Sequence, residues 1–162
     1  MILRLGDWVL EVDIPSTMER SGQHAADHCL CGYCQNFYST VDHAYPSIRP
    51  FLARFGVDIE GPDEFCPFEP TICEATYIVR GRIIQQGSQD ISVDGIPILI
   101  SAELDLDHAP PQPSFGIMVG LMELPWVLEE PMDEVISPAN DPACLDRMWK
   151  KLLKRSALNF DA

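Results

Sequence analysis

The first regular pattern in the chain is an alternation of apolar and polar residues over 8–14, which predicts a half-buried strand. Pro15 is expected to end this strand. Ser16 and Glu19 then have the spacing of a capping box, in which each residue's side chain satisfies a free backbone N–H near the helix start. The pattern predicts a short helix over about 17–28.

Apolar residues recur every three or four positions over 34–45 and again over 48–55, which predicts two consecutive helices. Gly56 is placed to end the second helix in the left-handed conformation that glycine adopts easily. The next segment, 57–73, is interrupted by glycine and several prolines and is predicted to be a loop.

Strand patterns return in the second half of the chain. Residues 77–83 alternate and are rich in β-branched side chains, and 91–93 is followed by 96–106 across Asp94-Gly95, a strong hairpin signal. Residues 115–124 are apolar on both faces, which is typical of a central strand.

The last pattern is an amphipathic helix that follows Asp141, a good N-cap residue, and Pro142. Its apolar stripe contains Leu145, Met148, Trp149, Leu152 and Leu153, and its other face contains Arg147, Lys150, Lys151, Lys154 and Arg155. The order of elements predicts the α+β class. We expect a single domain over 1–162, with a mainly antiparallel sheet of about five strands. N-terminal helices and the C-terminal amphipathic helix would pack on it.

The charge of the chain narrows the possible partners. The net charge is −14, and residues 1–141 contain 23 Asp or Glu, six Arg and no Lys. Such a surface repels a phosphate backbone, so no nucleic-acid partner is expected. A protein partner, basic if charge decides the choice, is compatible with this surface.

Neither a secretory leader nor an apolar segment long enough to span a bilayer is recognisable. We therefore predict a cytoplasmic protein without membrane association. Thiols stay reduced in the cytoplasm, so the six cysteines are not interpreted as a disulfide framework.

The candidate chemistry is concentrated in residues 28–37, His-Cys-Leu-Cys-Gly-Tyr-Cys-Gln-Asn-Phe. Cys31 and Cys34 have the spacing of a chelating knuckle, and Cys29 and His28 are close enough along the chain to join them. Zinc prefers four thiolate or imidazole ligands, so these four residues form the predicted zinc site. His24, Cys66 and Cys73 are further possible ligands.

A second interpretation is redox chemistry. A Cys-x-x-Cys pair at a helix N-terminus has a stabilised first thiolate. Cys31-Gly32-Tyr33-Cys34 resembles the active-site tetrapeptide of thioredoxin-like proteins, and 95–99 is similar to that family's cis-proline segment. This resemblance covers about ten residues. It implies that Cys31 is the nucleophile, Cys34 the resolving thiol and Pro97 a substrate-facing residue of a thiol–disulfide oxidoreductase.

A third interpretation is that the cysteines only fill the core, as Cys34, Cys66, Cys73 and Cys144 could each do. The chain also resembles a family of small uncharacterised bacterial proteins. The resemblance lies in Cys29-x-Cys31-x-x-Cys34-x-Asn36-Phe37, in 55–58 with 62–64, and in Leu124-Pro125-Trp126-Val127-Leu128. It implies one domain and no particular function.

Two other patterns are weaker. Asp90 to Gly95 imitates half of an EF-hand loop, but position twelve is Ser101 where a Glu is needed. Glu103, Asp105 and Asp107 would share one strand face and are interpreted as its solvated side. The sequence thus favours a non-enzymatic binding protein with a structural or zinc-binding cysteine cluster, and a thiol–disulfide enzyme is the alternative.

Overall fold

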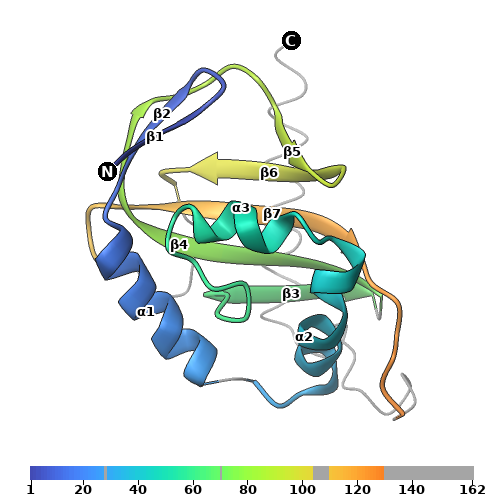
Figure 1. The fold of residues 1–162 in the computed structure, drawn as a ribbon. Coiled ribbons are helices and arrows are strands. Elements are labelled where there is room, and N and C mark those ends of the chain that lie inside the picture. Colours follow the sequence, from blue (N-terminus) through green and yellow to red (C-terminus); the bar gives the residue numbers. More distant parts are fainter. Residues whose placement is uncertain (28, 70, 104–109, 130–162) are drawn as a thin grey trace.

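The computed structural model describes residues 1–27, 29–69, 71–103 and 110–129 (Figure 1). Within them the helices are α1 (Ile14–Ala26), α2 (Gly32–Ala44) and α3 (Ile48–Ala53). The strands are β1 (Ile2–Leu5), β2 (Trp8–Val12), β3 (Glu64–Glu69), β4 (Ile72–Gln85), β5 (Ile91–Val93), β6 (Ile96–Ser101) and β7 (Ser114–Glu123).

These strands form one sheet in the order β1-β2-β4-β7-β6-β5, and β3 pairs with β4. Every pairing is antiparallel. The predicted α+β class with a mainly antiparallel sheet is therefore confirmed. The C-terminal helix predicted after Asp141 lies outside the described residues.

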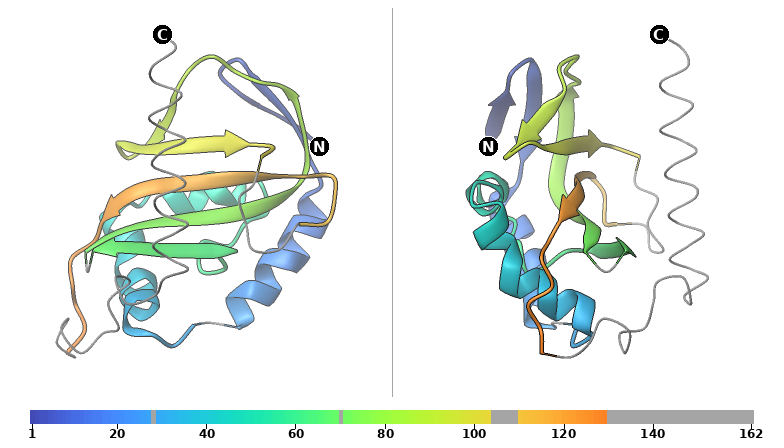
Figure 2. Two further views of the ribbon diagram at one scale, coloured as in Figure 1. Left: turned by 180° about the vertical axis from the view of Figure 1, so that it is seen from behind. Right: turned by 90° about the vertical axis from the view of Figure 1, so that its right-hand side faces the viewer.

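The three helices lie on one face of the sheet, as the side view in Figure 2 shows. Buried side chains of helices and strands meet between them in one hydrophobic cluster. Its largest fully buried members include Tyr77, Phe37, Phe55, Phe115, Leu10, Ile48, Leu52, Ile59, Ile117 and Met122. None of the helices in the described ranges is both long and apolar enough to cross a bilayer.

The described sheet has more strands than the predicted five. β1 was missed because it is short, and it pairs with β2 across the tight turn at Gly6 and Asp7. β3 was missed because Pro67 made 57–73 look like a loop. A proline is tolerated there because, among the described strands, β3 pairs only with β4, so its other edge needs no hydrogen-bond donor from them.

The start of α1 also differs from the prediction. The helix begins at Ile14, and its N-cap is Asp13 instead of Ser16. The Asp13 carboxylate accepts hydrogen bonds from the Ser16 backbone N–H (3.1 Å) and from the Ser16 hydroxyl (2.7 Å). Pro15 lies in the first turn, where its missing N–H has no helical partner to lose. The strand before it ends at Val12.

Other predicted elements are present with altered bounds. The Asp94-Gly95 hairpin joins β5 and β6, although β6 ends at Ser101 before the predicted 106. Gly56 has a φ of +79° after α3, as predicted for a left-handed helix end. β7 lies between β4 and β6, which confirms that 115–124 is an inner strand.

β4 is the longest strand, and it changes partner along its length. Its residues up to Arg80 pair with β7, and from Gly81 onward it pairs with β2. Gly81 has a φ of +149°, a conformation that suits glycine. The chain bends at this position, so the edge hairpin of β1 and β2 joins the sheet through a glycine.

Candidate functional site: a cysteine trio at the start of α2

The connection from α1 to α2 carries the three clustered cysteines. Cys29 lies in the connection, Cys31 is the N-cap residue of α2, and Cys34 is in the helix's first turn. Cys31 has extended backbone angles (φ −68°, ψ 154°), as N-cap residues usually do. The bend at the helix start therefore directs the side chains on either side of it toward one another.

The sulfur atoms of Cys29, Cys31 and Cys34 all lie within 4.8 Å of one another. We call this group the cysteine trio. Cys29 and Cys31 are exposed and Cys34 is buried, and all three are free thiols. The structure thus brings together three of the four predicted zinc ligands, while His28 lies outside the described residues.

The trio has an asymmetric protonation pattern. Hydrogen bonding from the Cys34 thiol, aided by the backbone N–H of Cys34, lowers the pKa of Cys31 to about 5. The same contact, together with burial and the charge of Cys31, raises the pKa of Cys34 well above its usual value. In the metal-free protein one proton is thus shared between a thiolate at Cys31 and a thiol at Cys34.

A cavity of about 410 Å³ opens beside the trio. Two trio members contribute to its wall, and the remaining lining comes from α1, α2 and the 60–65 segment. The lining residues are Gln23, His24, Asp27, Cys29, Cys34, Tyr38, Glu60, Pro62 and Phe65. Burial, which disfavours the charged phenolate, is the main cause that raises the pKa of the Tyr38 hydroxyl. Tyr38 and Glu60 carried no recognisable signal in the sequence.

His24 lies in the cavity wall and is oriented by Asp63. Its Nε2 is 3.4 Å from the Asp63 carboxylate, which also pairs with Arg20 at 2.6 Å. The other Asp63 oxygen accepts a hydrogen bond from the backbone N–H of Ile78 (2.7 Å). Asp63 therefore ties α1 to β4, and His24 is outside the 4.8 Å group of ligand atoms.

The remaining cysteines within the described ranges are distant from this chemistry. Cys66 lies in β3 and Cys73 in β4, and both are buried. Burial raises the pKa of the Cys73 thiol to about 12, so it stays protonated at neutral pH. Cys73 belongs to the hydrophobic core, as the core-filler interpretation predicts for it. Cys144 lies outside the described part of the chain.

The buried side chain of Asn36 fastens α2 to the segment after β7. Its amide nitrogen donates to the Pro125 carbonyl (3.1 Å), and its oxygen accepts from the Val127 N–H (2.9 Å). The ring of Tyr33, the residue just before Cys34, meets Trp126 edge to face at 6.0 Å between centroids. A polar residue within an apolar helix stripe was the signal that could have predicted this clamp.

The clamp joins the cysteine motif to 124–128, two of the segments that carry the resemblance to the family of small bacterial proteins. Pro97, the third residue of the redox interpretation, lies elsewhere. It is exposed on β6 opposite Ser92 and is absent from the cavity lining. β6 is separated from β3 by both β7 and β4.

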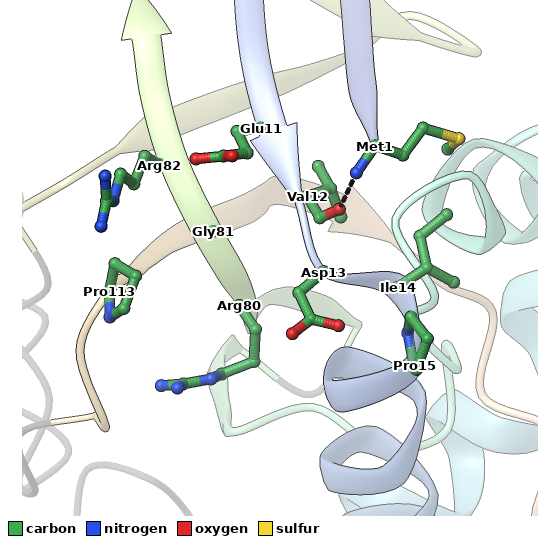
Figure 3. Close-up of a pocket in the computed structure, with 10 residues that line it drawn as sticks. All are labelled: Met1, Glu11, Val12, Asp13, Ile14, Pro15, Arg80, Gly81, Arg82 and Pro113. Carbon is green, nitrogen blue, oxygen red and sulfur yellow. Dashed lines mark hydrogen bonds between the residues drawn. The ribbon is translucent and has the colours of Figure 1, made fainter.

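A second hollow, of about 460 Å³, lies where β2, β4 and the start of α1 meet (Figure 3). Arg80 and Arg82 extend to the same side of β4 there. The Arg80 guanidinium donates to the Pro111 carbonyl and to the Ser114 hydroxyl (3.1 Å). No cysteine or histidine is among the described residues of its wall.

Comparisons with known proteins point to no relative: no family model, no curated protein and no solved structure matches the chain. The two resemblances noted in the sequence therefore stay predictions. The case for a function depends on the geometry of the trio and its cavity.

Proposed function

We propose that the protein binds zinc through the thiolates of Cys29, Cys31 and Cys34. The supporting observation is that their sulfur atoms lie within 4.8 Å of one another. Sulfurs bound to a tetrahedral zinc at ~2.3 Å are about 3.8 Å apart, so small side-chain rotations would close the trio on an ion.

The protonation pattern supports the same proposal. In the metal-free protein the hydrogen bond to Cys31, burial and repulsion by the Cys31 thiolate together raise the pKa of Cys34. A divalent cation between the sulfurs would remove this repulsion and replace the shared proton. The close spacing of the three sulfurs is therefore more favourable with a bound cation than without one.

In this proposal the protein is a non-enzymatic binding protein, and zinc braces the connection between α1 and α2. The Asn36 clamp links α2, which begins at this connection, to 124–128, so metal binding would stabilise two segments at once. The net charge of −14 favours a basic protein as its partner.

The test is the metal content of protein purified without added metal. We expect about one zinc per chain by elemental analysis. The triple variant Cys29→Ser, Cys31→Ser, Cys34→Ser should contain none, because hydroxyls are poor zinc ligands. Native protein that remains free of metal after incubation with zinc would contradict the proposal.

A second candidate is a thiol–disulfide oxidoreductase, favoured by the lowered pKa of Cys31 at a helix start. The Cys31 thiolate would attack a substrate disulfide, forming a mixed disulfide and releasing one thiolate. Cys34 would lose its proton and displace the second substrate thiolate. Cys31 and Cys34 would then be joined by a disulfide, and the substrate would be reduced.

This candidate predicts the pH profile of alkylation in metal-free protein. Because the thiolate is the nucleophile, Cys31 should react with iodoacetamide at half its maximal rate near its pKa of about 5, and faster above it. Mass spectrometry would locate the adduct. Insulin reduction that is lost in Cys31→Ser and kept in Cys29→Ser would favour the enzyme. If the alkylation rate of Cys31 instead reaches half its maximum at a pH near the pKa of a free thiol, an activated Cys31 is excluded.

A further inference from the structure

We infer that a metal held by the cysteine trio keeps its fourth coordination position open to the adjacent cavity, and that this position accepts a small neutral nitrogen donor such as an imidazole group. The inference rests on the proposed zinc site and names the ligand class that the site takes.

The first argument is the position of the trio relative to the cavity. Cys29 and Cys34 both line it, so an ion between the three sulfurs would face about 410 Å³ of open space. A structural zinc site is closed by four protein ligands, whereas a site that exchanges ligands keeps one position for a small molecule. The described side chains supply three ligands beside a cavity, which is the second arrangement.

The second argument is charge. A divalent ion with three thiolates carries a net charge of −1, and the cavity wall adds the carboxylates of Asp27 and Glu60. Arg49 pairs with Glu60 at 2.8 Å and offsets part of that charge. Neither Lys nor Arg is among the described residues of the wall. An anionic fourth ligand would be repelled, and a neutral one would not.

The third argument is the shape and polarity of the wall. Tyr38 and Phe65 contribute aromatic rings and Pro62 adds an apolar surface. The other described residues of the wall are polar or charged, so the cavity combines an apolar side with hydrogen-bonding groups, as sites for small organic ligands do. An imidazole ring fits this description, because its nitrogen can bind the metal while its carbon atoms contact the wall.

The experiment uses the full-length protein loaded with Co²⁺, whose visible absorption reports its ligands. The sulfur-to-cobalt charge-transfer bands show that the trio binds the ion. At about pH 8, where imidazole is neutral, adding imidazole should shift the d–d bands saturably and leave the charge-transfer bands in place. Azide, a small anion, should need about tenfold higher concentration for half-saturation.

A pair of variants tests the role of charge. Asp27→Asn should bring the half-saturating concentrations of imidazole and azide closer together, because it removes a carboxylate from the cavity wall. Glu19→Gln removes the same charge from an exposed position on α1 and should leave the ratio of the two half-saturating concentrations unchanged.

The outcomes separate this inference from the proposed function. Absence of charge-transfer bands would overturn the zinc site itself. Suppose that the charge-transfer bands are present but the d–d bands respond to imidazole only in the His28→Ala variant: His28 then closes the site in the native protein. If the d–d bands respond in neither the native protein nor this variant, another ligand closes the site. Either result would overturn the open position alone. Azide binding more tightly than imidazole would overturn the preference for a neutral donor.

Discussion

Replacing Gly81 with alanine should destabilise the fold by about 2–4 kcal/mol, a lowering of the melting temperature by roughly 5–15 °C for a chain of this size. A Cβ atom at Gly81 would overlap the carbonyl oxygen of Glu11 and come within 3.1 Å of the Val12 Cα. The φ of +149° is also unfavourable for any residue with a side chain. Thermal and urea unfolding monitored by circular dichroism would measure the loss.

Gly22→Ala is the matched control. Gly22 is exposed in the middle of α1, and a Cβ atom there has nothing within 4 Å. Alanine has the higher helix propensity, so this variant should be as stable as the wild type or up to about 1 kcal/mol more stable. Equal stabilities of Gly81→Ala and wild type would contradict the close approach of β2 to β4.

Cys34→Ala should weaken zinc binding by about a hundredfold or more. A zinc site with four ligands is worth about 10–16 kcal/mol, so the loss of one thiolate removes a few kcal/mol. Cys34 is also the residue whose proton the ion must displace, because its pKa is raised in the metal-free protein. Zinc binding by the native protein should therefore weaken as the pH falls, since protons then compete more strongly for the Cys34 sulfur. Competition with a chromophoric chelator at several pH values would measure both effects.

Cys73→Ala removes another buried thiol and serves as the control. Burial in the core raises the pKa of Cys73 to about 12, and it is outside the trio. Its loss should lower stability by the removal of buried contacts but leave zinc affinity unchanged. Equal zinc affinities of Cys34→Ala and Cys73→Ala would show that the trio is not the binding site.

Elements whose signals are local were predictable. The Asp94-Gly95 turn joins β5 to β6 as expected, because two residues with positive φ are enough to form it. Gly56 ends α3 for a similar reason. β3 shows the opposite case, since the proline in its middle is tolerated because it lies at an edge of the described sheet. Whether a strand is at an edge depends on its neighbours, and the local sequence does not contain them.

The same distinction applies to the candidate site. Spacing alone predicted that Cys29, Cys31 and Cys34 lie close together, since a stretch of six residues at a bend cannot separate them far. The cavity combines α1, α2 and the 60–65 segment, and no spacing relates these. The Asn36 clamp likewise joins residues about ninety positions apart.

The sequence by itself determined the α+β class, the β5–β6 hairpin, the apolar stripes of the helices and the grouping of three thiols at one turn. Each depends on interactions between residues a few positions apart. Only the tertiary structure decided which strand lies at the edge and why Gly81 has to be glycine. It also decided that Asp13 caps α1 and what surrounds the trio. These features depend on contacts between distant segments, which form only when the helices pack against the sheet.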